Sequence, residues 1–487
     1  MKNFEVNSNK RYNFAIAVIF IVSILLRFGL ALYNREANDS HMPVVRYIMK
    51  NNSLPEKPDC SECFQPKLFH YTIAKILSFM RLNHIPDSDA QKVVAQFVNL
   101  LSGVVTLVVA WMFMGRLPGI HDGVRILSFA LLAFNPQLIG INSQVTNDTF
   151  LILLCTLAVY CAYFFLRKPN FVYFLFSVIF SVLAIITKTN GWVTVIAISM
   201  AFFVRSSQSK IGLTGVLFSA IAYPILVIGL VLLNPLSQYT RNYQQYGSPV
   251  ALNIDPLSHP SFFEKTYIPN AGILSIQDGF LTFKFWILLK EPVTHRQDAV
   301  SEGSHRTSLW TRLYGSANSL HFENYPPSWR IKSQAVYWVY RGIFILALLP
   351  ASVMLIGAAM EIYWTIKGIL TSDTLLLNNV SYGLFALLFV GYILFVMLYA
   401  FEYRVYMVMK AVFTYPALLA FFVCFAKGST WIYSRPQIKK QHIVIAIILM
   451  IALLVLYVLD VAILLLQLIP NQSGFNLIIE RLIHAWQ

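Results

Sequence analysis

Asp39, His41 and Glu62 lie in a polar segment that follows the first long apolar run of the chain. A carboxylate near the level of the lipid headgroups can deprotonate a hydroxyl while a lipid-linked molecule stays in the membrane. Asp39 is therefore our predicted catalytic base, with His41 and Glu62 in supporting roles. The same three side chains could also bind a hard divalent cation such as Mg²⁺ or Mn²⁺, with Asp39 as a ligand. The simpler alternative is that Asp39 caps the helix expected after it.

Asp148 is the second acidic candidate, and it stands at the start of another long apolar run. An acidic residue at a helix N-terminus caps the helix and favours its dipole, which is the simple explanation for this position. The functional alternative is that Asp148 supports the base at Asp39 or binds an acceptor or a metal.

Four basic residues could bind a phosphate group whose negative charge grows during a reaction. Lys188 separates two closely spaced apolar runs, where an unpaired cation is costly, so a functional role is favoured there. For the other three, a side chain that extends to the membrane interface is a competing explanation. The candidates are Lys67, Lys188, Arg241 and Arg404.

The composition requires that most of the chain lies in a membrane. Of 487 residues, 57% are hydrophobic and only 12% are charged, and the mean hydropathy is +0.62. A soluble protein carries about 25% charged residues, so a cytosolic enzyme, a nuclear factor and a disordered scaffold are excluded. We predict an all-α polytopic membrane protein with eleven spans of about 20 residues each. They are 13–33, 90–114, 124–143, 149–166, 171–187, 190–205, 211–234, 336–361, 375–400, 405–426 and 441–468.

The net charge of +15 could suggest binding to nucleic acid. With the N-terminus in the cytoplasm, however, the cytoplasmic segments carry 14 basic and four acidic residues, as the positive-inside rule requires. The outer segments 34–90 and 236–335 have net charges of zero and +2. We therefore predict no nucleic-acid partner and place the functional residues on the extracytoplasmic face. The expected parts are a membrane module (1–235) with its outer loop (34–90), an extracytoplasmic region (236–335) and C-terminal membrane helices (336–487).

Cys60 and Cys63 form one CxxC pattern in the first outer segment. An oxidising exterior permits a disulfide between them. A redox role and a metal site remain alternatives.

Several short motifs, spread over residues 10–430, resemble those of the GT-C glycosyltransferases and follow one another in the same order. The resemblance is to glycosyltransferase family 39, which includes protein O-mannosyltransferases, the lipid A aminoarabinose transferase and related lipopolysaccharide sugar transferases. Gln65, Pro66, Leu68 and Tyr71 fit the family's Gln-Pro-Pro-Leu-Tyr-Tyr box, with Lys67 in place of the second Pro. Where many relatives have Asp-Glu, this chain has Asp39-Ser40. The other matching segments are Asn147-Asp148, Thr187-Lys188, 241–249, 308–315 and 410–416.

This resemblance implies a GT-C-type bundle with interfacial helices, and an inverting transfer of a sugar from a polyprenyl-monophosphate donor. The acceptor would be a hydroxyl or phosphate of a lipid, a glycan or a protein. Lys67, Lys188, Arg241 and Arg404 would then contact the donor phosphate. Aromatic and polar side chains that could contact the sugar or acceptor are Gln65, Tyr71, Trp310 and His321, although an interfacial aromatic belt and a solvated loop also explain the last two.

Two other classes of function stay open at this point. A lipid flippase or transporter needs ionisable groups along a path through the membrane, and Arg27, Arg341, Lys410 and Asp460 lie within predicted spans. A non-catalytic subunit of a glycan export complex is the third interpretation.

Overall fold

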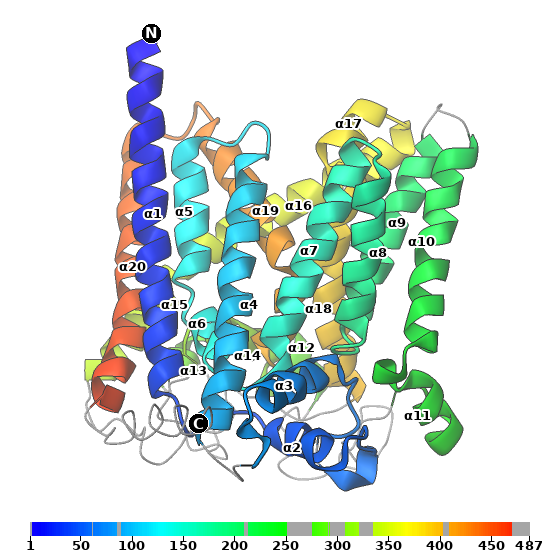
Figure 1. Cartoon of the computed structure of the whole chain (residues 1–487). Helices are drawn as coiled ribbons and strands as arrows, with labels where there is room; N and C mark the ends of the chain where they lie inside the picture. Colours follow the sequence, from blue (N-terminus) through cyan, green and yellow to red (C-terminus); the bar gives the residue numbers. More distant parts are fainter. Residues whose placement is uncertain are drawn as a thin grey trace.

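The chain folds as a bundle of helices (Figure 1). The computed structural model describes residues 2–60, 62–84, 89–208, 213–250, 275–290, 292, 307–320, 335–402 and 409–469. Every regular element in those ranges is helical, which confirms the predicted all-α class.

The elements of the N-terminal half begin with the long helix α1 and end with the short helix α11. The long helices among them contain the apolar runs of the sequence, whereas α11 is polar. Their bounds are α1 (Lys2–Tyr33), α2 (Met42–Asn51), α3 (Leu68–Phe79), α4 (Asp89–Gly115), α5 (Asp122–Ala133), α6 (Pro136–Asn142), α7 (Asn147–Arg167), α8 (Phe171–Ile185), α9 (Gly191–Gln208), α10 (Leu213–Leu233), the 3₁₀ turn η3 (Pro235–Ser237) and α11 (Tyr239–Tyr246).

The C-terminal half combines short helices with further long ones. Their bounds are α12 (Ile276–Phe280), α13 (Phe285–Lys290), α14 (Leu309–Ala317), α15 (Ala335–Leu346), α16 (Leu348–Thr371), α17 (Thr374–Asn379), α18 (Leu384–Glu402), the 3₁₀ segment η8 (Ala411–Ala417), α19 (Leu418–Tyr433) and α20 (Lys440–Leu468).

Seven helical segments of the described chain are long and apolar enough to cross a membrane, and α5 with α6 makes an eighth if this pair, bent by 48°, is one span. The helix α8 and the described parts of α9 and α10 are apolar but shorter. Each predicted span overlaps one of these segments, while the total of eleven stays a prediction. The predicted span 375–400 is wrong at its start: Asp373 caps the separate helix α17, and Tyr382 has a φ of 55°, so α18 begins only at Leu384.

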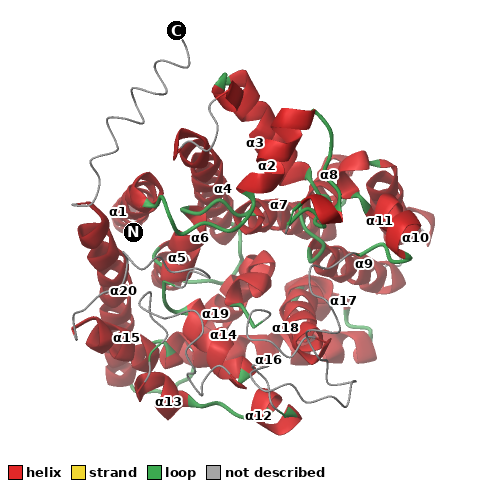
Figure 2. Ribbon diagram, turned by 90° about the horizontal axis from the view of Figure 1, so that it is seen from below, coloured by secondary structure: helices red, strands yellow, loops and turns green. Residues whose placement is uncertain are grey.

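The polar elements gather at one end of the bundle. The short helices α2, α3, α11, α12 and α14 lie at the lower end in Figure 1, and the view from below in Figure 2 shows them in front of the long helices. The turns from α6 to α7 and from α8 to α9 reach the same end, whereas α17 lies at the opposite end. The described parts of the two polar segments therefore lie at one end of the bundle. Its assignment to the extracytoplasmic face rests on the charge distribution alone.

Helices α16 and α19 approach each other at two glycines. A Cβ atom on Gly357 would lie 1.8 Å from the carbonyl oxygen of Cys424, and one on Gly428 would lie 2.1 Å from that of Val353. Small residues allow helix backbones in a membrane to approach this closely. The two glycines therefore determine the spacing between these two helices.

We expect Gly357→Ala to destabilise the bundle, because the added methyl group must push the two backbones apart, at a cost of about 1–3 kcal/mol. Gly229→Ala on α10 is the control, since a Cβ there meets no atom within 4 Å. Thermal melting in detergent should show a lower midpoint for Gly357→Ala only. Equal midpoints for the two variants would contradict the close packing of α16 and α19.

Candidate functional site

The candidate site is centred on a buried ion pair between Asp148 and Lys188. Thr146 caps α7 by accepting a hydrogen bond from the Asp148 backbone N–H at 3.3 Å. The Asp148 carboxylate is then 2.6 Å from the Lys188 ammonium, and Asp148 is only 6% exposed. Lys188 lies in the turn between α8 and α9, so the pair joins the start of α7 to that turn. Asp148 is thus more than a helix-capping residue.

Lys410 adds a second cation to this cluster. The ammonium groups of Lys188 and Lys410 lie 5.3 Å and 5.9 Å from the centre of the Phe413 ring. Asp148 also interacts electrostatically with Lys410 and with His41. In the sequence, Lys410 is an ionisable residue within an apolar run and the first residue of the matching segment 410–416, but it was not among the predicted site residues. Its charge at that position was the available signal.

Asp39 lies on the loop between α1 and α2, half-buried, next to the turn that leads into α7. The side chain of Asn38 accepts hydrogen bonds from the Val145 backbone N–H at 2.7 Å and from Gln96 at 3.1 Å. Asn34 donates to the Ser143 carbonyl at 3.0 Å on the same turn. The N-cap position of α2 is occupied by His41, so Asp39 precedes that position rather than filling it.

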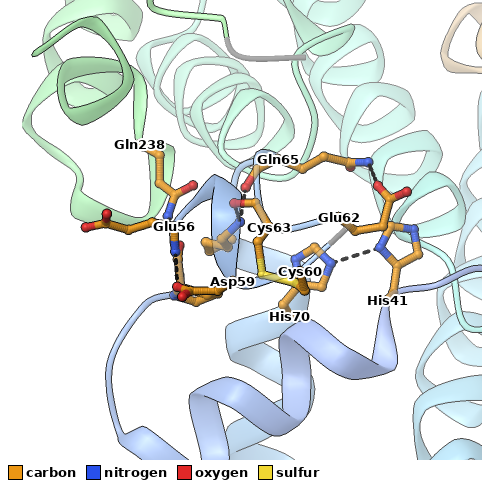
Figure 3. The surroundings of a disulfide bond; sticks show 11 residues. His41, Glu56, Asp59, Cys60, Glu62, Cys63, Gln65, His70 and Gln238 are labelled. Atoms are coloured by element: carbon orange, nitrogen blue, oxygen red, sulfur yellow. Dashed lines mark hydrogen bonds between the residues drawn. A yellow bond between two sulfur atoms is a disulfide. The ribbon is translucent and has the colours of Figure 1, made fainter. Parts of the chain in front are cut away.

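His41 and Glu62 each have a partner within the first outer segment (Figure 3). The Nδ1 atom of His41 is 2.9 Å from Nε2 of His70, a residue that sequence reasoning did not single out. Gln65 donates to the Glu62 carboxylate and accepts from Asn147 at 2.5 Å. Gln65 therefore connects the first outer segment to the residue directly before Asp148.

Lys67 is fully buried and holds the turn closed by the Cys60–Cys63 disulfide. Its ammonium group donates to the carbonyl oxygens of Cys63 and Gln65, both at 2.6 Å. Burial lowers the pKa of Lys67 to about 7, and nearby Glu62 opposes this shift. Binding of a donor phosphate by Lys67 stays a prediction. The contacts that the structure shows for Lys67 stabilise the turn.

The burial of His70 affects its protonation within the pair that it forms with His41. The pKa of His70 is lowered well below its ordinary value, first by burial and then by the positive charges of His41 and Lys67. A neutral His70 can share one proton with His41 across their hydrogen bond.

The other predicted site residues lie away from the ion pair or outside the described residues. Arg241 on α11 is exposed and pairs with Glu56 at 3.2 Å. Tyr71 lies under the ammonium group of Lys75, which is 5.1 Å from its ring centre. Trp310 donates to the Phe280 carbonyl at 2.7 Å. Two further predicted residues, His321 and Arg404, lie outside the described residues.

The described residues contain no cluster of three or more His, Cys, Asp and Glu side chains suited to a metal ion. His41 is hydrogen-bonded to His70, and Glu62 to Gln65, so these two candidate ligands have separate partners. Metal binding by Asp39 stays a prediction, and the proposed sugar transfer does not require it.

A cavity of about 570 Å³ lies among α5, α14, α16, α18, η8 and α19. This volume is within the range of about 300–1,000 Å³ typical of ligand pockets. Most of its lining is apolar, and the indole of Trp310 and the phenol of Tyr415 also face it. Ala411 and Thr414, which directly follow Lys410 and Phe413 in the sequence, belong to its lining.

Comparison with known proteins supports the class inferred from the motifs. Residues 84–237 match the family model described as dolichyl-phosphate-mannose-protein mannosyltransferase. This match confirms the resemblance to GT-C glycosyltransferases over about a third of the chain. The matched range includes Asp148 and Lys188, whereas Asp39 and Lys67 precede it. No curated protein sequence matches the chain significantly.

Two solved structures show a distant likeness. The Saccharomyces cerevisiae protein O-mannosyltransferase Pmt1–Pmt2 complex, bound to the sugar donor, aligns at 15% identity with a TM-score of 0.36, over 54% of this chain and 38% of that one. ArnT from Cupriavidus metallidurans, bound to undecaprenyl phosphate, aligns at 13% identity with a TM-score of 0.35, over 84% and 77% of the two chains. The alignment therefore spans less than half of the yeast chain.

Loss of one partner of the Asp148–Lys188 pair should leave an unpaired buried charge. Asp148→Asn and Lys188→Met should each lower the free energy of unfolding by about 3–5 kcal/mol, and the double replacement by less than the sum. Chemical unfolding in mixed micelles measures the three differences. Strictly additive losses would mean that the two side chains do not interact.

The buried Lys67 should make stability depend on pH. Its ammonium group loses a proton near pH 7 in the folded chain and near pH 10.5 when unfolded. Between these values the unfolded chain binds more protons, so the contribution of Lys67 to folding becomes more favourable as the pH rises. The stability of the wild type relative to Lys67→Met should increase from pH 7 to pH 10. Lys75→Met, at an exposed position on α3, the helix that Lys67 directly precedes, is the control. A constant difference for Lys67→Met would contradict the burial.

Proposed function

We propose that the chain is an inverting glycosyltransferase that moves a sugar from a polyprenyl-monophosphate donor to an acceptor in a membrane-associated glycan, lipid or protein. The observation that carries this proposal is the cluster of Asp148, Lys188 and Lys410 beside the Asp39 loop. It lies at the end of the bundle that also holds α2 and α3. The family match supports the reaction class, since it covers the segment from α4 to η3.

In the proposed reaction, the leaving group is the polyprenyl phosphate, which gains negative charge as the glycosidic bond breaks. Preorganised cations stabilise such charge most strongly where water is excluded. Lys188 and Lys410 both face the Phe413 ring and would bind this phosphate. The neighbouring apolar cavity would hold part of the isoprenoid chain.

Asp39 would act as the general base that accepts the proton of the acceptor hydroxyl. It is half-buried and held beside the turn before α7 by the contacts of Asn38. Asp148 would orient Lys188 rather than remove a proton, because its carboxylate is occupied by that ammonium group. We likewise propose, from the charge distribution, that the reaction takes place on the extracytoplasmic face. The proposal leaves the identity of the sugar and of the acceptor open.

Asp39→Asn should keep the fold and lower sugar transfer from a polyprenyl-phosphate donor by at least a hundredfold, because the amide cannot accept the proton. Glu36→Gln in the same loop is the matched control and should transfer at the wild-type rate. The measurement is transfer of radiolabelled sugar in proteoliposomes. Normal transfer by a well-folded Asp39→Asn protein would remove Asp39 as the base. Lipid movement without sugar transfer by the wild type would favour a flippase instead.

A further inference from the structure

A second cavity lies at the opposite end of the bundle from the candidate site. It has a volume of about 420 Å³ and is formed by the turn 117–120 and residues of α7, α16, α17, α18 and α19. Figure 1 places α17 at the end away from α2 and α3. The charge distribution predicts that this end faces the cytoplasm. The proposed transfer reaction uses no residue of this cavity.

Glu361 supplies the buried acid of this cavity. It is only 1% exposed, and its Oε1 accepts a hydrogen bond from the Lys427 ammonium group. Its Oε2 atom is buried, and within the described part of the chain it has no hydrogen-bond partner. A buried carboxylate oxygen without a donor is costly. The cavity therefore presents an acceptor that a ligand N–H group could satisfy.

Two cations line the same cavity. Lys427 also donates to the Asn379 carbonyl at 3.1 Å. Arg167, exposed at the end of α7, donates to the Tyr163 hydroxyl at 2.9 Å, and no carboxylate of the described residues pairs with it. A guanidinium group at the end of a membrane span lies at the level of the lipid phosphates and binds them well.

We propose that this cavity binds a phosphoethanolamine group, as the headgroup of a phospholipid. The primary ammonium group of the ligand would donate to Oε2 of Glu361, and its phosphate would face Arg167 and Lys427. The apolar side chains of Met360 and Leu376, which line the same cavity, would contact the adjoining part of the lipid. A choline headgroup has no N–H to offer Glu361, and a glycerol headgroup has no cation. Both fit less well.

The purified full chain, in micelles free of phosphatidylethanolamine, provides the test. Short-chain phosphatidylethanolamine should bind about tenfold more tightly than phosphatidylcholine with the same chains, because only the former makes the charged hydrogen bond. Native mass spectrometry measures both affinities. Glu361→Gln should abolish the preference, and Asp373→Asn, an exposed carboxylate at the same end, should keep it.

Arg167→Gln provides a second readout in case Glu361→Gln fails to fold, because Arg167 is exposed and its loss leaves the core intact. It should weaken the binding of both phospholipids while the melting temperature is unchanged. If soluble phosphoethanolamine displaces the lipid, the site recognises the headgroup alone. If only the intact lipid binds, the site also requires the acyl chains. Equal affinity of the wild type for the two lipids, or binding of neither, would overturn the proposal.

Discussion

The buried ion pair between Asp148 and Lys188 is the constraint on which the candidate site depends. Neither charge can remain in a membrane interior without its partner, so the start of α7 and the turn between α8 and α9 must lie at the same depth. The ring of Phe413 lies beside Lys188, which brings η8 to that depth as well. Helices far apart in the sequence are thereby held at one level, with the ammonium groups of Lys188 and Lys410 beside the same ring.

Hydrogen bonds of amide side chains attach the first outer segment to the start of α7. Asn34 and Asn38 bind the backbone of the turn before α7, and Gln65 binds Asn147 at the start of that helix. The disulfide and the buried ammonium group of Lys67 fix the shape of the loop that presents Gln65. A structural use of Lys67 therefore still serves the site, because it positions the side chain that connects the two segments.

The sequence predicted the helical class, and it singled out Asp148 and Lys188, which the structure pairs. These follow from hydropathy and from the cost of charges in apolar runs, which are local properties. The partners were not predictable in the same way. The contact of His41 with His70, the carbonyl ligands of Lys67 and the approach of Lys410 to Phe413 arise from packing between distant segments. The span count was uncertain because α8 is short and the chain bends between α5 and α6 at Pro136.

The two acidic candidates differ in a way that bears on the proposed mechanism. A general base must reach the acceptor proton at hydrogen-bond distance and then carry the proton away. Asp148 is buried, and its carboxylate contacts an ammonium group at 2.6 Å, so accepting a proton there would break the pair that holds the site together. Asp39 lies on a half-buried loop whose position is set by its neighbours Asn38 and Asn34. The proposed division of roles, with Asp39 as the base and Asp148 as the partner that orients Lys188, rests on this difference in position and burial.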